Sequence, residues 1–518
     1  MVTGTEYTAA EDVAGSKLIL EFSDLEKILI DMGMEYRDGE FEDPIPFPTT
    51  GINNLLLTHP HADHIGQVIK LCKAGFKGGI FTPYASADIA TKIQLPQQAN
   101  NFWMHNKRAQ DLAKKGIYIP RKKVLWGYRD FKNIRDTQFR YFEEPEEGKK
   151  VQLGFPYETP IEILNKRDTK VTATFYEAGH IPGSSQILLE IEDKGVKSKI
   201  LTSFDLGRTD YHIKGHPIAD TPIVKAPHTD FPEDIDSMVI EATYGNKTHS
   251  GDDPREVLED VINHTAKKNG QLIIGAFSIM RTHMLQYYLY DLDLQGKLPD
   301  NMHFYVTSPG ADKCGRIMLK HQQDLDEEAI KRFIDKKDNF FYFDRLTHHN
   351  KVQQTKDALA QGDAINPCGW LASSGMFQGG RIERLLRNGG LQDPRNTILA
   401  TGYQSPGTRG YDLINGATKI PFLDGGIIER KAEVRRMHGL SGHADIEELV
   451  AHVKNVCTPE ESRRRDKMFR VYVKHGEKES CWAVKARLEK EGYVRENNAE
   501  VVVMKKGKSY DFGYRKAA

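Results

Sequence analysis

The residues best suited to chemistry stand in the segment THPHADH, where histidine and aspartate crowd into a few positions. The segment contributes His59, His61, Asp63 and His64. Imidazoles two positions apart on a loop can reach one ion together, while the next aspartate and histidine point to a neighbouring ion, and such nitrogen and oxygen ligands suit Zn²⁺. A lone histidine is usually a surface or satisfied core residue, but three within six positions favour a metal site.

The elements around this segment predict a strand, a loop and then a helix. Residues 17–60 contain three apolar runs, KLILEF, KILIDMG and NNLLLTH, which are typical of successive strands. In the stretch HIGQVIKLCKAGF, Ile65, Val68, Ile69 and Cys72 fall at i, i+3, i+4 and i+7, the spacing of a helix with one buried face. Residues 172–205 repeat the strand pattern and again place polar residues at strand ends. The metal-type residues are therefore expected on a strand-to-helix loop.

From about residue 235 the pattern changes to a parallel α/β alternation. Strand-like runs (SMVIEATYG, QLIIGAF, MHFYVTS, NTILATGY) alternate with helix-like segments such as DDPREVLEDVINHTAKKNG. This predicts a second α/β unit inserted between about residues 235 and 425, after which the chain returns to strands and helices that carry His443 and His475.

Composition limits the classes of protein that fit. The chain has 518 residues, a formal net charge of -1, 39% hydrophobic and 28% charged residues. It is long enough for several folded domains, and its composition excludes a disordered or collagen-like chain. With no global basic field, any contact with nucleic acid must be local. The five cysteines lie far apart without a CxxC pair, and no apolar run is long enough to span a bilayer, so a reducing, cytoplasmic location and no membrane are expected.

The motifs resemble those of a known family. HPHADH is similar to the HxHxDH motif of the metallo-β-lactamase fold hydrolases, and LIDMG, AGHIPGS and SFDLGR supply Asp31, His180 and Asp205 at that family's further motifs. IEATYGNKTH, with Glu241, resembles the motif A signature of the β-CASP subgroup. LSGHAD places His443 at motif B, and VKHGEKES places His475 at motif C, where a histidine resembles the RNA-processing rather than the DNA-repair members. Within that group the chain looks like the polyadenylation-factor type.

The resemblance implies a fold and a division of the chain. The fold is an α/β one, an αββα metallo-β-lactamase sandwich with an inserted parallel α/β β-CASP domain. The sandwich would be formed by residues 1–234 and 426–518, and the β-CASP domain by residues 235–425.

The resemblance also implies two zinc ions and roles for the residues around them. His59, His61 and His180 would hold one ion and Asp63, His64 and His475 the other, with Asp205 bridging. Paired metal ions lower the pKa of a bound water from 15.7 towards ~7 and stabilise the attacking and leaving oxygens, so the zinc-bound hydroxide would attack a phosphodiester.

Four further features complete the expected site. Asp31 would position the histidine loop, and Asp63 would serve catalysis as well as metal binding. His443, oriented by Glu241, would either protonate the leaving oxygen or hydrogen-bond the phosphate. The loop of Ser373, Ser374 and Gly375 could bind phosphate or sugar through hydroxyls and amides.

Other segments give weaker signals. Phe102, Trp103 and His105 with Lys107 and Arg108 mix aromatic and basic residues, for which helix packing is favoured over binding of a single strand. Arg463, Arg464, Arg465, Lys467 and Arg470 form a charge run, for which a solvated face is favoured over RNA contact. His348 and His349 are interpreted as surface histidines. In GYQSPGTRG, Pro406 and Arg409 depart from the family phrase and could narrow the substrate path or add a phosphate contact.

The sequence thus favours a zinc-dependent ribonuclease that cuts single-stranded RNA endonucleolytically. Three alternatives stay open: a 5′-3′ exoribonuclease of the same family, a small-molecule metallo-hydrolase of the same fold, and a non-catalytic scaffold, although none of the expected ligands is missing. A homodimer is also left open.

Overall fold

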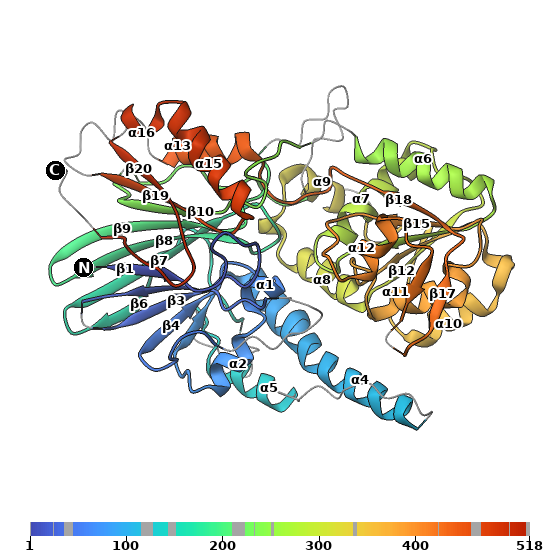
Figure 1. Ribbon diagram of the computed structural model, residues 1–518, viewed down its shortest axis with the longest axis horizontal. Coiled ribbons are helices and arrows are strands. Elements are labelled where there is room, and N and C mark those ends of the chain that lie inside the picture. Colours follow the sequence, from blue (N-terminus) through green and yellow to red (C-terminus); the bar gives the residue numbers. More distant parts are fainter. Residues whose placement is uncertain are drawn as a thin grey trace.

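The computed structural model divides the protein into two lobes that stand side by side (Figure 1). It describes residues 2–513 apart from 24, 36–44, 115–127, 143–151, 210–222, 233, 250–252, 335–338, 423, 457–467 and 497. The left-hand lobe of the figure holds two large sheets, and the right-hand lobe holds a third.

The first sheet of the left-hand lobe comes mainly from the N-terminal part of the chain. Its strands lie in the order β21 (Ser509–Asp511), β1 (Thr3–Glu6), β2 (Leu18–Glu21), β3 (Lys27–Ile30), β4 (Ile52–Leu56) and β5 (Gly79–Phe81). The three strands expected within residues 17–60 form here as β2, β3 and β4. The histidine-rich segment follows β4, as the sequence predicts.

The second sheet combines the middle of the chain with its C-terminal part. Its strands lie in the order β20 (Ala499–Val503), β19 (Phe469–Val473), β10 (Ser237–Ile240), β9 (Val196–Ser203), β8 (Ser185–Asp193), β7 (Thr169–Glu177) and β6 (Ile161–Lys166). Apolar residues of both sheets, such as Leu20 of β2 and Phe175 of β7, belong to one buried cluster. The two sheets therefore face each other across a common core.

Helices cover the outer face of each of these sheets (Figure 1). Residues of α2 (Val68–Lys73) and α5 (Tyr128–Thr137) share a core cluster with β3 and β4. Residues of α13 (Ile446–Val456) and α15 (Lys478–Lys490) share another with β10 and β19. The left-hand lobe is thus an αββα sandwich, which confirms the expected fold. Its remaining helices are α1 (Ala62–Ile65), α3 (Tyr84–Ile89), a π-helical turn (Ala90–Gln94), α4 (Leu95–Ala113) and α16 (Tyr493–Glu496).

The single helix expected after the histidine segment forms in two pieces, α1 and α2. The break lies at Gly66 and Gln67, where the Gln67 N–H donates to the carbonyl of Met32 at 2.9 Å. A Cβ at Gly66 would stand 2.4 Å from both the Ala62 carbonyl oxygen and the Met34 Cβ, so the chain is held against its neighbours here. Tertiary contact thus interrupts a periodicity that by itself favours one helix.

The right-hand lobe contains a six-stranded sheet in which all the strands run parallel. Their order is β13 (Leu346–His348), β12 (His303–Thr307), β14 (Cys368–Ala372), β11 (Gln271–Gly275), β15 (Thr397–Ala400) and β18 (Glu433–Arg436). Helices α6 (Pro254–Lys267), α7 (Arg281–Leu294), α8 (Pro309–Lys320), α9 (Glu327–Ile334), α10 (Val352–Ala360), α11 (Gly380–Leu385) and α12 (Arg409–Ile414) accompany it, with a small hairpin of β16 (Lys419–Pro421) and β17 (Ile427–Glu429). The parallel α/β unit is the one that the sequence predicts.

Two strands fall across the domain limits that the sequence suggests. β10 lies after residue 234 but belongs to the second sheet of the sandwich, and β18 lies after residue 425 but belongs to the parallel sheet. The division at 234 and 425 stays a prediction, and each limit separates one strand from its sheet.

Apolar packing and a group of charges join the two lobes. Ile89, Ile93 and Ile181 of the sandwich belong to the same core cluster as residues of α7 and α8. Beside them, the buried carboxylate of Asp88 accepts hydrogen bonds from Lys320 Nζ at 2.8 Å and His321 Nε2 at 3.0 Å. The lobes therefore share part of their interior.

Some expectations fall partly outside this description. Arg463, Arg464, Arg465 and Lys467 lie outside the described residues, as do the side chains of Phe102, Trp103, His105 and Arg108 within α4. Among the residues that are described, no helix combines the length and apolar character needed to cross a bilayer.

Candidate metal centre

Six chemistry-bearing residues stand just beyond the carboxyl ends of strands in the sandwich. Asp31 follows β3, His59 follows β4, His180 follows β7, Asp205 follows β9, Glu241 follows β10 and His475 follows β19. Within each sheet these strands run in the same direction. The side chains therefore gather at one edge of the sandwich, which is where strand direction in each sheet requires them to be.

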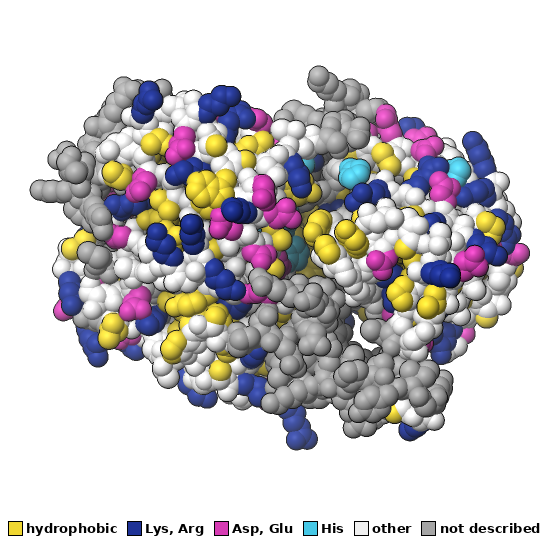
Figure 2. Space-filling view, in the orientation of Figure 1, with side chains coloured by type: hydrophobic (Ala, Val, Ile, Leu, Met, Phe, Trp, Pro, Cys, Tyr) yellow, Lys and Arg dark blue, Asp and Glu magenta, His cyan; other side chains and the backbone are white. Residues whose placement is uncertain are grey.

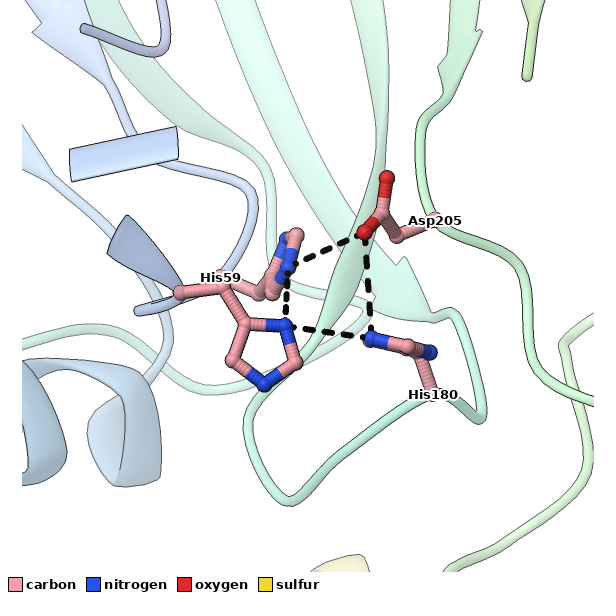
Figure 3. A group of neighbouring side chains, drawn as sticks. His59, His180 and Asp205 are labelled. Carbon is pink, nitrogen blue, oxygen red and sulfur yellow. Dashed lines mark hydrogen bonds and ion pairs between the residues drawn. The ribbon is translucent and has the colours of Figure 1, made fainter. Parts of the chain in front are cut away.

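The first candidate metal group consists of His59, His61, His180 and Asp205. His59 Nε2 lies 3.0 Å from His61 Nδ1, and His61 Nδ1 lies 3.2 Å from His180 Nε2. Asp205 Oδ2 stands 3.3 Å from His59 Nε2 and 3.7 Å from His180 Nε2. Figure 3 shows His59, His180 and Asp205 pointing towards one another. Their ligand atoms thus surround a common point.

The second group consists of Asp63, His64, Asp205 and His475, and it shares Asp205 with the first. His64 Nε2 lies 3.2 Å from both His475 Nε2 and Asp205 Oδ1. Asp63 Oδ2 stands 3.9 Å from His64 Nε2 and 3.8 Å from His475 Nε2. Asp205 therefore presents one carboxylate oxygen to each group.

The donors fit metal ions. Burial, reinforced by the charge of a neighbouring imidazole, holds the pKa of His59, His61 and His180 well below 6.5, so each ring is neutral and has one nitrogen with a lone pair for a cation. Burial likewise lowers the pKa of His475 to about 3. Asp205 Oδ1 is buried between the imidazoles of His64 and His475, at 3.2 and 3.1 Å. Imidazole nitrogens and carboxylate oxygens crowded together in a protein interior are costly unless a cation satisfies them.

Hydrogen bonds at the far side of two rings fix which nitrogen faces the centre. His180 Nδ1 donates to the carbonyl of Gly442 at 3.0 Å, and His64 Nδ1 donates to Asp31 Oδ2 at 2.6 Å. Both rings then turn Nε2 inward, as ligand histidines do when a partner holds the other nitrogen.

Asp31 lies behind the histidine loop rather than in either group. Its other contacts are with Thr58, whose N–H donates to Oδ1 at 2.9 Å and whose hydroxyl donates to Oδ2 at 2.8 Å. The carboxylate therefore links the start of the histidine segment to His64, the geometry that a positioning role needs.

His443 and Glu241 form a pair next to the first group. His443 Nδ1 donates to Glu241 Oε1 at 3.1 Å, and the His443 ring stands 4.5 Å from the His180 ring, centroid to centroid. Burial opposes the charged imidazole, but the Glu241 carboxylate outweighs it and raises the pKa of His443 to about 9. Glu241 also accepts from the backbone N–H groups of Leu206 and Thr243 at 2.7 and 3.0 Å. The pair is thus held in place and disposed to carry a proton.

His249 is a further residue of the site. It lies in the IEATYGNKTH segment but was not among the residues predicted from the sequence. His249 Nε2 donates to the carbonyl of His443 at 2.9 Å, and its backbone N–H donates to Asp445 Oδ2 at 3.0 Å. His249, Asp445 and Glu448 also form a candidate metal group. However, Asp445 Oδ1 already accepts from two N–H groups at the start of α13, so these contacts are those of a brace on the His443 loop.

A second unpredicted feature lies beside His475. Lys474 is fully buried, and its Nζ lies 2.5 Å from Glu6 Oε2 and 2.7 Å from Ser16 Oγ. The N–H of His475 donates to the carbonyl of Ala9 at 2.8 Å. The N-terminal segment therefore supports the far side of the candidate metal centre.

The small-residue loop of Ser373, Ser374 and Gly375 follows β14 in the other lobe. Ser373 Oγ donates to Ser308 Oγ at 3.1 Å, and Ser308 Oγ lies 2.9 Å from Ser278 Oγ. Both serines of the loop are half-buried. The loop lies at the carboxyl edge of the parallel sheet, outside the two metal groups.

The expected phosphate contact of Arg409 and the interpretation of His348 and His349 as surface histidines are wrong, while a narrowing of the substrate path by Pro406 and Arg409 stays a prediction. Arg409 does not offer its charge to a substrate: it is buried over the Phe422 ring and donates to the carbonyls of Phe377 and Pro421. His348 and His349 are not surface residues either, because His349 is 6% exposed and His348 donates to the carbonyl of Phe341 at 2.7 Å. Sequence spacing alone did not reveal the backbone carbonyls and ring that bind these side chains.

Family models match three parts of the chain. Residues 18–85 match the metallo-beta-lactamase superfamily, residues 282–413 the Beta-Casp domain, and residues 427–503 the Zn-dependent metallo-hydrolase RNA specificity domain. Fold, donor set and matches define a metal-dependent hydrolase of the metallo-β-lactamase fold. The chain belongs to the β-CASP group of these hydrolases.

Its relatives in that group include proteins from bacteria, archaea and yeast. It is 26% identical over 483 residues to ribonuclease TTHA0252 of Thermus thermophilus, covering 92% of this chain and 94% of that protein. It is 26% identical to the transcription termination factor FttA of Methanosarcina mazei, covering 88% of this chain and 64% of that protein. Endoribonuclease YSH1 of Yarrowia lipolytica is also 26% identical, over 72% of this chain and 39% of its own length. The chain thus spans less than two thirds of the last two relatives.

Proposed function

We propose that this protein is a zinc-dependent ribonuclease that hydrolyses phosphodiester bonds within single-stranded RNA. The observation that carries the proposal is the sharing of Asp205 by two ligand groups beside the His443 and Glu241 pair. The match to an RNA specificity domain and the similarity to a ribonuclease of Thermus and an endoribonuclease of Yarrowia support RNA as the substrate.

The proposed ligands divide into two sets of three around the shared carboxylate. His59, His61 and His180 would hold one zinc ion and Asp63, His64 and His475 the second, with Asp205 between them. When bound, the ions supply an activated water and neutralise charge on the phosphate.

The chain's own groups perform the remaining steps. Asp31 and Thr58 keep the histidine segment in place, so that the ligand nitrogens need not reorganise. The protonated imidazole of His443 donates to the leaving oxygen or to the phosphate, while Glu241 holds Nδ1 and leaves Nε2 for the substrate. The loop of Ser373, Ser374 and Gly375 offers hydroxyls and amides to the backbone of the strand.

The deciding experiment uses end-labelled linear RNA and circular RNA of the same sequence, with and without a chelator. Cleavage of both that stops with the chelator and returns with zinc is the expected result. Degradation of linear 5′-monophosphate RNA that leaves the circle intact would replace the endonuclease by a 5′-3′ exonuclease. A protein that cuts no nucleic acid but cleaves thioesters would be a small-molecule hydrolase. A protein that shows neither activity would be a non-catalytic scaffold.

Two further expectations from the sequence belong to this proposal. A cytoplasmic location is consistent with an RNA substrate. Light scattering of the purified protein measures its molar mass and shows whether it forms a homodimer.

A further inference from the structure

An exposed aromatic surface stands at the carboxyl edge of the parallel sheet. The Phe277 side chain is 39% exposed and that of Tyr403 is 61% exposed. Phe277 follows β11 and Tyr403 follows β15, and these two strands are direct neighbours. In the space-filling view, hydrophobic side chains of the right-hand lobe border the furrow between the lobes (Figure 2). Large aromatic rings are costly to leave in water, so their use is worth seeking.

Two glycines lie next to the Phe277 ring. A Cβ at Gly375 would stand 3.1 Å from Phe277 Cδ2, and one at Gly402 would stand 3.5 Å from Phe277 Cε2. Gly375 follows β14 and Gly402 follows β15, the two strands that flank β11. Glycines on both sides therefore seat the ring against backbone, and a fraction of it remains open to solvent.

The backbone beneath the rings is fixed. The carbonyl of Phe277 accepts from the N–H and the hydroxyl of Thr282, at 3.1 and 2.7 Å. Arg281 at the start of α7 donates to the carbonyl of Thr401, which precedes Gly402. A ring on a fixed backbone loses little freedom when a flat ligand covers it.

Hydroxyl groups lie next to the rings. Ser278 follows Phe277 directly, and its Oγ belongs to the hydrogen-bonded group with Ser308 and Ser373. Aromatic faces beside neutral donors suit a ligand that combines flat bases with a sugar-phosphate backbone.

The chain itself limits the distance from this edge to the metal groups. The N–H of Met437 donates to the carbonyl of Ala400 at the end of β15, and Gly442 accepts from His180. The five Cα-to-Cα steps from Met437 to Gly442 span at most about 18 Å when extended. Burial and, after it, the charge of Glu477, two residues after His475, raise the pKa of Tyr403. The rings therefore stand within reach of one bound strand that also enters the metal centre.

We infer that Phe277 and Tyr403 form a stacking platform for nucleobases of the RNA strand, outside the metal centre. This inference rests on the proposed function and specifies how its substrate is held. Every base has a flat face, so the platform contributes affinity without selecting a sequence.

The test distinguishes the loss of base stacking from a change in side-chain volume. Phe277→Leu removes the aromatic face but keeps an apolar side chain, and Phe277→Tyr keeps the face. Leu294→Ala is the matched control, because Leu294 is 55% exposed at the opposite end of α7, a helix of 14 residues or about 21 Å. Each variant is assayed in the zinc-loaded protein by single-turnover cleavage of labelled single-stranded RNA, and its fold is checked by circular dichroism.

Phe277→Leu and Tyr403→Leu are expected to raise the RNA concentration at half-saturation by roughly 5- to 100-fold, the effect of losing a stacked base. The rate at saturation should change little, and Phe277→Tyr and Leu294→Ala should behave as the unaltered protein does. An abasic oligomer of the same length should bind with the same affinity to His443→Ala and to the double variant His443→Ala with Phe277→Leu, because it has no bases to stack.

Contrary results are readily distinguished. Unchanged half-saturation for Phe277→Leu, or an equal loss on the abasic oligomer, would overturn the platform while the ribonuclease proposal stands. An unaltered protein that neither binds nor cuts RNA would overturn both.

Discussion

His443 differs from the neighbouring histidines in what its ring nitrogens face. The first group's imidazoles face one another across the candidate metal site, whereas His443 Nδ1 donates to Glu241 Oε1 at 3.1 Å. Burial lowers the pKa of His443, but Glu241 outweighs it and the pKa is raised to about 9. The proposed function therefore assigns metal binding and proton delivery to separate residues.

His443→Ala should retain both metal ions and lose roughly 10²- to 10⁴-fold in single-turnover rate, the usual contribution of general acid-base catalysis. The matched control is His438→Ala, since His438 is exposed in the same segment and should tolerate the change. Metal content is measured by mass spectrometry beside the cleavage rate. Normal cleavage, or loss of zinc, would show that His443 has another role.

Asp205 should control both ions because it presents one oxygen to each group. We expect Asp205→Ala to lower metal occupancy at both positions, whereas His61→Ala should affect one ion only. The number of zinc ions per chain, measured on freshly purified protein, tests this difference. Two fully occupied positions in Asp205→Ala would exclude the bridge.

At the scale of elements, β1 supports the site through one buried ion pair. Glu6 accepts at one oxygen from the backbone N–H groups of Thr8, Ala9 and Lys17, and its other oxygen binds Lys474. Lys474 also lies 3.9 Å from the centroid of the Phe204 ring, so the pair touches the residues before both Asp205 and His475. Breaking it leaves a buried charge unpaired.

Glu6→Gln should therefore lower the free energy of unfolding by about 3–5 kcal/mol, whereas Glu21→Gln, at an exposed pair with Lys27, should cost less than about 1 kcal/mol. Denaturant unfolding of the sandwich lobe measures both. Equal effects would contradict the prediction.

The same pair has a defined pH dependence. Burial raises the pKa of Glu6, but Lys474 and the backbone donors outweigh it and hold the pKa below 4.5. The stabilisation is thus complete above the unfolded-state pKa of about 4.5 and is lost as the pH falls through the lowered folded value.

Strands and candidate metal ligands can be predicted from the sequence more easily than the residues that hold the site in place. β2, β3 and β4 form where apolar runs predict them, because a buried strand needs such a run. Lys474 and His249 escape prediction because each acts through a contact with a distant segment. Asp31, Asp205 and His475 have φ of +60°, +40° and +51°, left-handed conformations that no local pattern in these motifs signals.

At the scale of the whole molecule, Asp88 connects the lobes. Its carboxylate, 6% exposed, pairs with Lys92 on its own helix and with Lys320 and His321 of the other lobe. Burial opposes the carboxylate, but these partners hold its pKa well below the usual range. Removal of Asp88 leaves His321, 5% exposed, without this partner.

Asp88→Ala should weaken the lobe contact by about 3 kcal/mol, the lower end for breaking a buried pair. Small-angle X-ray scattering should show a larger radius of gyration, and protease cleavage between the lobes should accelerate. Asp130→Ala is the control, because Asp130 pairs with Lys73 within the sandwich at an exposed site. An unchanged radius and protease pattern would show that apolar packing alone joins the lobes.

The segment between β18 and α13 connects the parallel sheet to the candidate metal centre. It leaves the parallel sheet at Met437, touches His180 at Gly442 and delivers His443 next to Glu241. The candidate ligands belong to the sandwich, whereas the segment that ends at His443 begins on the parallel sheet of the other lobe. Under the proposed function, a movement of one lobe against the other would act on the proton donor through residues 437–442, whereas the metal ligands depend on the sandwich alone.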